Sequence, residues 1–369
     1  MPSTSEPVSL GAEPQTLVDR DGALGRIRLN RPRALNSLTL EMVRDIEAAL
    51  DRFEHDPAIA AVLVTGEGER GLCAGGDIRA IYDAGKAGSE LPATFWREEY
   101  RLNARIGRYA KPYVVVMDGI VMGGGVGISA YGSHRIVTER SRFAMPETGI
   151  GFFPDIGASW FLTRQNNELG TYVALAGEPL GAADVMLTGL ADSFVSSDRL
   201  PALAKQLAGL PAGATGEEIS VCIQGFSATP PAGTLEAHQQ AIERLFAFKT
   251  VEEIFEALRR DGSAFSENVL AVLSAKSPLS LKVTLRLLRL GRQTASLESC
   301  LEREFAATAA VLRSHDFYEG VRAAVIDKDR NPQWHPARLG DVTEAQVAAY
   351  FQPSAHPLFA EMIEGGPRT

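Results

Sequence analysis

The order of apolar and polar residues predicts strands that alternate with helices over the first half of the chain. Residues 23–30 alternate apolar side chains with arginines, which is typical of a half-buried strand. The runs at 59–65 and 113–117 are continuously apolar and predict buried strands. Further strands are predicted at 16–18 and 135–138, and helices at 40–53, from about 77, and at 95–109, 126–131, 158–164, 169–176 and 182–189. This alternation favours an α/β fold with largely parallel strands.

A different pattern follows a segment rich in Pro, Gly, Ala, Ser and Thr at 210–233, which predicts a boundary. Beyond it, apolar residues recur at helical spacing. The predicted helices cover residues 235–249, 251–260, 267–274, 278–290, 297–314 and 344–351. We therefore expect a disordered N-terminus at 1–14, an α/β core at 15–210 and a mainly helical C-terminal region at 211–369.

The composition narrows the partners and the compartment. The chain has 369 residues, is 45% hydrophobic and 22% charged, and has a formal net charge of −9. Nucleic-acid binders carry a basic surface, so we expect no nucleic-acid partner. No apolar run reaches the length of a membrane span, so no membrane partner is expected. The first 14 residues lack the features of a targeting segment and the three cysteines are widely spaced, which predicts a cytoplasmic protein.

Two glycine stretches stand out because each follows a predicted buried strand. Ala74-Gly75-Gly76 follows the strand at 59–65, and the triple glycine at 123–125 follows the strand at 113–117. Glycine turns expose backbone N–H groups, and two donors from separate loops form an oxyanion hole when they converge on one carbonyl oxygen. Either stretch alone is equally compatible with a tight turn. The pair favours a site for the carbonyl of a coenzyme A thioester.

Two carboxylates follow the triple glycine. Glu147 and Asp155 lie eight positions apart, and each comes directly after a proline. Apolar residues surround both in the sequence, and a carboxylate in an apolar environment has a raised pKa. Such a group can serve as base, acid or nucleophile, although each is equally compatible with a capping or salt-bridged role. The segment 117–155 therefore predicts an active site for acyl-thioester chemistry.

Other catalytic and cofactor motifs are not supported. Residues 66–71 match G-x-G-x-x-G, but the third glycine does not open a helix, and two glutamates would face a pyrophosphate. Neither Gly-Lys-Ser/Thr nor Gly-x-Ser-x-Gly occurs in the sequence. The six histidines show no metal-ligand spacing. We therefore expect no metal and no cofactor.

Several stretches resemble the crotonase (enoyl-CoA hydratase/isomerase) superfamily. They are LNRP at 29–32, ALN at 34–36, CAGGDI at 73–78 and the triple glycine. Others are similar to the branch of that superfamily that hydrolyses 3-hydroxyisobutyryl-CoA. They are FWREEYRLN at 95–103, FAMPET at 143–148, FPD at 153–155, SHDFYEGVR at 314–322 and IDKD at 326–329. The resemblance implies a spiral core of ββα turns followed by a helical C-terminal region.

The resemblance also assigns roles to individual residues. Gly76 and Gly124 match the superfamily's two oxyanion-hole donors, and Glu147 matches its catalytic glutamate. Asp155 matches the second acidic residue of the hydrolase branch, and Glu99 matches a residue that contacts substrate there. These five residues are the candidates for catalysis and for contact with the acyl group.

The substrate site is expected to extend to neighbouring residues. Ala74 and Gly75 lie beside the first oxyanion donor, and Arg33 and Arg79 are candidates for binding the coenzyme A phosphates. Each arginine is equally compatible with a solvated surface position. Hydratases of the superfamily use two glutamates, and the first would fall at Gly127, which has no side chain. The resemblance therefore disfavours hydration.

The implied reaction is hydrolysis of a short branched 3-hydroxyacyl-CoA thioester. The expected substrate is 3-hydroxyisobutyryl-CoA, which would yield 3-hydroxyisobutyrate and CoA in valine catabolism. Glu147 would attack the carbonyl or activate water, and both routes stay open. Two alternatives remain, an enoyl-CoA isomerase and a non-catalytic crotonase-fold subunit. A homo-oligomer is also left open, because superfamily members often form trimers or hexamers.

Overall fold

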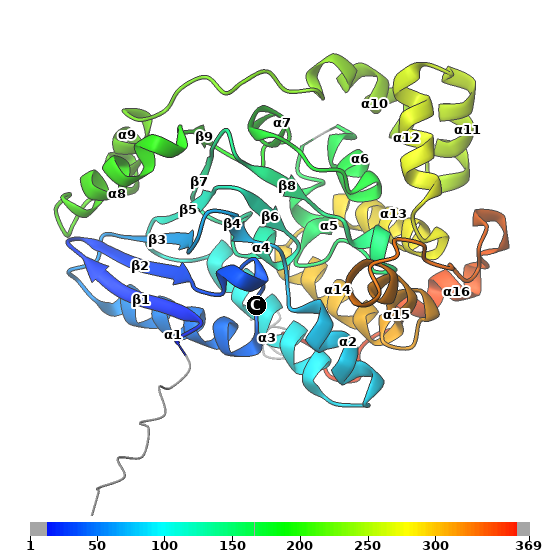
Figure 1. Cartoon of the computed structure of the whole chain (residues 1–369), viewed down its shortest axis with the longest axis horizontal. Coiled ribbons are helices and arrows are strands. Elements are labelled where there is room, and N and C mark those ends of the chain that lie inside the picture. Colours follow the sequence, from blue (N-terminus) through cyan, green and yellow to red (C-terminus); the bar gives the residue numbers. More distant parts are fainter. Residues whose placement is uncertain (1–12, 166, 360–369) are drawn as a thin grey trace, which may run out of the picture.

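The computed structural model describes residues 13–165 and 167–359, which form two sheets and a large set of helices (Figure 1). The larger sheet has the strand order β1-β2-β3-β5-β7-β9. Its strands are β1 (Thr16–Asp21), β2 (Leu24–Leu29), β3 (Ala61–Gly66), β5 (Tyr113–Met117), β7 (His134–Val137) and β9 (Ser193–Phe194). Only the β1–β2 hairpin is antiparallel. Residues 1–12, most of the predicted disordered N-terminus, lie outside the described residues.

A smaller parallel sheet completes the α/β core. It contains β4 (Gly71–Cys73), β6 (Ile120–Met122) and β8 (Arg142–Ala144), in that order. Three consecutive strand pairs, β3–β4, β5–β6 and β7–β8, repeat one arrangement. In each pair the first strand belongs to the larger sheet and the second to the smaller sheet, and a helical segment follows. This repetition confirms the predicted spiral of ββα turns. The three short strands were not predicted, because three residues show no readable periodicity.

Alternation along the central strands buries both faces of the larger sheet. In β3, Val62 and Val64 join the main hydrophobic core, whereas Ala61 and Leu63 join a second, smaller core. The main core includes the apolar faces of α1 (Leu40–His55) and α3 (Leu91–Gly107), and the smaller core includes α8 (Leu200–Ala208) and α9 (Gly216–Gln224). Successive side chains of a strand point to opposite faces of the sheet, so both faces carry apolar side chains and both are covered by helices.

The helices predicted at 40–53 and from about 77 both begin at a side-chain cap. Thr39 accepts a hydrogen bond from the Met42 N–H at the start of α1, at 3.2 Å. Asp77 accepts one from the Ala80 N–H, at 3.3 Å, at the start of α2 (Ile78–Lys86). The predicted helix at 126–131 is wrong in its bounds, because α4 spans Gly124–Gly127 and only turns follow it. The core also contains α5 (Ala158–Phe161), α6 (Leu169–Ala176) and α7 (Ala182–Leu187).

After β9, the described chain contains helices and no further strand. The remaining helices are α10 (Gln239–Phe246), α11 (Val251–Asp261), α12 (Ala264–Ser274), α13 (Pro278–Arg292), α14 (Leu297–Val311), α15 (His315–Val321) and α16 (Glu344–Ala348). The predicted irregular segment at 210–233 contains α9, because a Thr215–Glu218 capping box starts a helix there. The division at residue 210 stays a prediction. None of the helices in the described ranges is long and apolar enough to cross a membrane.

The C-terminal helices return to the α/β core (Figure 1). α14 packs against α3 and α5, and α15 packs against α2 and the 3-10 helix η2 (Glu147–Ile150). Glycines allow the close approach of α15. A side chain at Gly151 would collide with the Asp316 carbonyl, and one at Gly320 would collide with the backbone of Ile150. The helical region therefore supports the segment that carries Glu147.

Candidate active site

The predicted catalytic residues surround one small cavity of about 110 Å³. Its lining includes residues 74–76 and 122–124, which carry the two glycine stretches, together with Glu99, Glu147 and Asp155. Phe95, Trp96 and Phe152 supply an apolar surface, where the Trp96 and Phe152 rings stack with centroids 5.6 Å apart. The structure thus brings together segments that lie far apart in the sequence.

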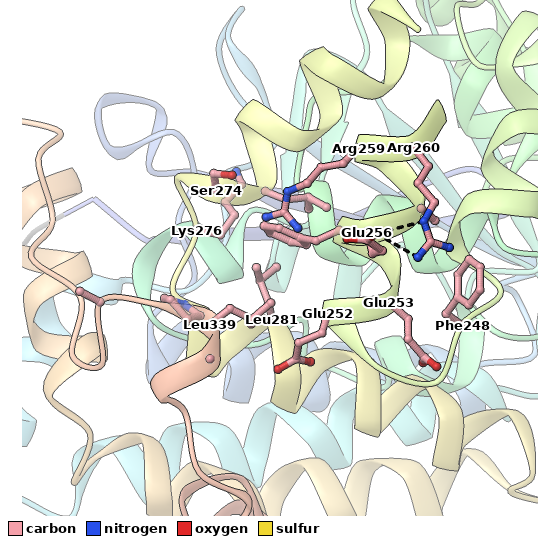
Figure 2. A pocket seen from close by; sticks show the side chains of 16 residues that line it. Phe248, Glu252, Glu253, Glu256, Arg259, Arg260, Ser274, Lys276, Leu281 and Leu339 are labelled. Carbon is pink, nitrogen blue, oxygen red and sulfur yellow. Dashed lines mark hydrogen bonds and ion pairs between the residues drawn. The ribbon is translucent and has the colours of Figure 1, made fainter. Parts of the chain in front are cut away.

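A larger cleft of about 820 Å³ lies on the helical region, between α11 and the α12–α13 junction (Figure 2). It is lined by mixed charges, including an ion pair between Glu256 and Arg260 at 2.9 Å. None of the predicted site residues lines this cleft. The smaller cavity is the candidate site because the two glycine stretches and three carboxylates line it together.

The two glycine stretches meet because β4 and β6 are adjacent parallel strands. Their carboxyl ends lie at the same edge of the smaller sheet, and the chain continues into Gly76 and Gly124 there. A Cβ placed on Gly124 would lie 3.2 Å from the Gly76 nitrogen. Among the described residues, neither the Gly76 N–H nor the Gly124 N–H donates to a protein acceptor. Two adjacent, free N–H donors are the geometry of an oxyanion hole.

Three buried carboxylates face these donors. Glu147 begins η2, Asp155 lies in the irregular segment between η2 and α5, and Glu99 projects from α3. A Cβ on Gly123 would lie 3.2 Å from Glu147 Oε1, and one on Gly124 would lie 2.5 Å from Glu99 Oε1. Side chains at these glycines would therefore obstruct the site.

The hydrogen bonding of the three carboxylates is sparse. The Tyr100 hydroxyl donates to Asp155 Oδ2 at 2.6 Å. Glu147 Oε2 and Glu99 Oε1 are buried and have no hydrogen-bond partner within the described residues. Buried polar atoms usually have partners, so these two oxygens are available to a substrate or to water.

Burial raises the pKa of all three carboxyl groups, and repulsion between carboxylates adds to the shift in Glu99 and Glu147. Burial raises the pKa of Glu147 well above its ordinary value, and the Asp155 carboxylate raises it further. Burial, followed by repulsion from Asp155 and Glu147, does the same to the pKa of Glu99. Burial raises the pKa of Asp155 to about 7, although the Tyr100 hydrogen bond opposes the change. Each of these carboxyl groups therefore keeps a proton to a higher pH than an exposed carboxyl group does, which suits groups that act as acid or base.

Neighbouring side chains crowd the position of Gly127, where hydratases of the superfamily carry their first glutamate. A Cβ placed there would lie 2.9 Å from Asn103 Nδ2 and 3.2 Å from Ile156 Cβ. Asn103 is fully buried, and neither of its amide atoms has a protein partner in the described ranges. Asn103 and Tyr100 were not predicted as site residues. The helical spacing from Glu99 to Asn103 was the available signal, because residues i and i+4 share one face.

The predicted substrate-contact residues divide into two groups. Ala74 and Gly75 line the cavity, beside the oxyanion donors. Arg33 and Arg79 are exposed and do not line it, and the Arg79 guanidinium donates to the Val325 carbonyl at 3.0 Å. Their phosphate-binding role stays a prediction. Among the residues that the structure describes, no three His, Cys, Asp or Glu side chains are arranged so that they could hold a metal ion.

The fold and this site are those of coenzyme A ester chemistry, and comparison with known proteins identifies the family. Residues 24–351 match the model of the enoyl-CoA hydratase/isomerase family, and the chain belongs to this family. A mitochondrial 3-hydroxyisobutyryl-CoA hydrolase of Rattus norvegicus is 44% identical over 343 residues, 92% of this chain and 89% of the relative. The Homo sapiens protein of the same name is 42% identical over 346 residues, with coverage of 92% and 89%.

Two solved structures share the fold over nearly the whole chain. One is named as a carnitinyl-CoA dehydratase from Mycobacterium thermoresistibile, with a TM-score of 0.87 and 42% identity, covering 93% of this chain and 98% of that chain. The other is named as an enoyl-CoA hydratase from Rhodobacter sphaeroides 2.4.1, with a TM-score of 0.83 and 38% identity, covering 92% and 98%.

The comparisons correct the predicted location. The relatives are named as mitochondrial, so the predicted cytoplasmic location is wrong. That prediction rested on the composition of residues 1–14 and on the wide spacing of the cysteines. The cysteine spacing does not distinguish one reducing compartment from another.

Proposed function

We propose that the protein hydrolyses the thioester of 3-hydroxyisobutyryl-CoA to 3-hydroxyisobutyrate and CoA, a step of valine catabolism. The curated relatives named for this reaction match about nine-tenths of the chain, at 92% coverage for the Rattus norvegicus protein. One observation carries the proposal in the structure. Two free glycine N–H groups lie beside the Glu147 carboxylate, whose Oε2 atom is buried without a partner.

The thioester carbonyl oxygen would accept hydrogen bonds from the Gly76 and Gly124 N–H groups. Negative charge develops on this oxygen when the carbonyl carbon becomes tetrahedral, and fixed N–H dipoles stabilise it. Losing one such donor typically lowers the rate by about 10² to 10³-fold. The glycines are required because any Cβ at Gly124 would approach both Glu99 and the Gly76 nitrogen.

Glu147 would act in its ionised form, in one of two ways. In the first, its oxygen bonds to the thioester carbon, the C–S bond breaks, and water then hydrolyses the mixed anhydride. In the second, it accepts a proton from a water molecule that attacks the same carbon. The leaving thiolate takes up a proton in either case. Asp155, with a pKa raised to about 7, is partly protonated at neutral pH, and its protonated form would supply the proton.

Glu99 and Asp155 would bind the 3-hydroxyl group of the acyl chain or position Glu147. Both carboxyl groups line the cavity, and the Glu99 Oε1 atom has no protein partner among the described residues. A hydroxyl group can donate to a carboxylate and accept from a carboxylic acid. This arrangement suits a 3-hydroxyacyl group better than a plain acyl chain.

Hydration is the second candidate that the comparisons raise, because two similar structures carry the names of a dehydratase and a hydratase. The environment of Gly127 opposes it, since the space for the first glutamate of a hydratase is taken by Asn103 and Ile156. No observation favours the isomerase or the non-catalytic subunit. A homo-oligomer stays a prediction.

The proposal is tested with purified protein and a panel of 3-hydroxyacyl-CoA and 2-enoyl-CoA esters. Release of free thiol reports hydrolysis, and loss or gain of the conjugated double bond reports hydration or dehydration. We expect thiol release that is fastest with 3-hydroxyisobutyryl-CoA. Interconversion of the enoyl and 3-hydroxyacyl esters without thiol release would instead establish a hydratase.

A further inference from the structure

The turn that follows Asp155 has an unfavourable backbone conformation. Ile156 has φ +56° and Gly157 has φ +84°. The left-handed region is accessible to glycine but is an outlier for a β-branched side chain such as isoleucine. Strained residues of this kind persist only where neighbouring groups hold them, and they cluster at functional sites. The contacts that hold this turn therefore bear on the geometry of Asp155.

Two side chains from outside the turn hold it in place. Glu304, on α14, accepts hydrogen bonds from the Gly157 N–H at 2.6 Å, the Ser159 N–H at 2.9 Å and the Ser159 hydroxyl at 2.5 Å. The Tyr131 hydroxyl donates to the Ile156 carbonyl at 2.7 Å. The Glu304 side chain is completely buried. Burying a carboxylate is unfavourable unless it is well hydrogen-bonded, and all three donors to Glu304 come from this one turn.

Asp155 is fixed directly at the start of the same turn. The Ala158 N–H donates to the Asp155 carbonyl at 2.9 Å, and the Tyr100 hydroxyl donates to its carboxylate. A shift of Gly157 or Ser159 would therefore move the backbone of Asp155. A displacement of about 1 Å at a reacting group can lower a rate by about 10²-fold.

We propose that Glu304 is a positioning residue for the hydrolysis, which holds the strained turn at 156–159 and thereby aims the Asp155 carboxylate at the thioester. The inference rests on the proposed function. It assigns a role in the site to α14 of the helical region, which contributes no residue to the cavity wall.

The same helix offers a matched control. Glu302 also accepts hydrogen bonds from two backbone N–H groups, those of Leu358 at 2.7 Å and Phe359 at 3.1 Å. Both of these donors lie in the C-terminal segment, outside the cavity. Glu302 is only half-buried, but Glu302→Gln changes a carboxylate that anchors backbone N–H groups from the same helix without touching the turn after Asp155.

The test compares Glu304→Gln with Glu302→Gln in the thiol-release assay. We expect Glu304→Gln to lower kcat by about 10²-fold with a change in KM below about threefold, and Glu302→Gln to retain kcat. When Glu304→Gln is added to Asp155→Asn, kcat should fall by less than about threefold relative to Asp155→Asn alone, because both changes act through the Asp155 carboxylate. Equal losses for Glu304→Gln and Glu302→Gln, or full additivity with Asp155→Asn, would overturn the proposal.

Two further measurements keep the outcome decisive. Tyr131→Phe removes the other anchor without burying or exposing a charge, so it serves where Glu304→Gln does not fold. We expect it to lower kcat and to lose that effect in the Asp155→Asn background. The rate of hydrogen–deuterium exchange in segment 152–163 measures how firmly the turn is held and requires no catalytic turnover. Faster exchange in Glu304→Gln than in Glu302→Gln supports the proposal, and equal exchange overturns it. This result does not depend on thiol release, so it separates a failure of the proposal from a failure of the proposed reaction.

Discussion

Replacing Asp155 with Asn should stabilise the protein at neutral and alkaline pH, although it removes a candidate catalytic group. The folded protein buries three carboxylates together, and burial raises the pKa of Asp155 from 3.8 to about 7. Each pKa unit corresponds to about 1.4 kcal/mol, so ionising Asp155 in the folded state opposes folding by roughly 4 kcal/mol at pH 8. Asn keeps an oxygen that can accept the Tyr100 hydrogen bond and carries no charge.

The sign of the pH dependence follows from proton binding. The unfolded chain releases the Asp155 proton near its ordinary pKa, whereas the folded chain retains it up to about pH 7. The folded state therefore binds more protons between about pH 4 and pH 7, and its stability falls as the pH rises through this window. Glu99 and Glu147 act in the same direction, because their pKa values are raised as well.

Urea unfolding of wild type and Asp155→Asn at pH 5, 6, 7 and 8 measures the effect. We expect the stability advantage of the variant to grow with pH. Glu253→Gln serves as a control, because the hydrogen bonds from Thr250 lower the pKa of Glu253 below its ordinary value. Glu253 stays ionised in both the folded and the unfolded state over most of this pH range, so the stability difference between Glu253→Gln and wild type should change little with pH. An Asp155→Asn difference that is independent of pH would refute the account of the carboxylate cluster.

Three further predictions concern the walls of the site. Gly124→Ala should lower the kcat of thiol release by at least about 10²-fold, because its Cβ would lie 2.5 Å from Glu99 Oε1 and obstruct the oxyanion donors. A variant with wild-type kcat would contradict the assignment of Gly124 to the oxyanion hole. Asp316→Asn should lower the free energy of unfolding by about 1–3 kcal/mol and also lower kcat. Buried Asp316 accepts a hydrogen bond from Ser277 Oγ at 2.6 Å, and the Ser277 N–H donates to the Thr148 carbonyl in η2, the segment that carries Glu147. Arg79→Ala should raise KM for the CoA ester and leave kcat unchanged if Arg79 binds a phosphate, and an unchanged KM would refute that role.

Local signals in the sequence were sufficient for the framework of the core. Thr39 and Asp77 mark helix starts because a side-chain cap needs only neighbours within one turn. The strands at 61–66 and 113–117 were recognisable because burial on both faces leaves a continuous apolar run. The smaller sheet was missed because its strands are three residues long and are defined by pairing with distant segments.

In the candidate site too, residues with a local sequence pattern were predicted and residues defined by distant contacts were missed. Glu147 and the glycine stretches carry local patterns, and the structure brings them to one cavity. Tyr100 and Glu304 lie 55 positions from Asp155 and 147 positions from Gly157, the groups that they contact. Such contacts depend on how α3 and α14 pack on the core, and no pattern along the chain reports them. The exposure of Arg33 and Arg79 was equally a property of the packed structure.

The most direct test of the central claim is the rate of thiol release from 3-hydroxyisobutyryl-CoA by wild type and Glu147→Gln. The substitution keeps the shape of the side chain and removes its ability to act as nucleophile or base. Glu178→Gln, an exposed carboxylate on the loop after α6, is the control. The account predicts that Glu147→Gln lowers kcat by about 10² to 10⁴-fold and that Glu178→Gln matches wild type. A Glu147→Gln enzyme with the wild-type rate would contradict it.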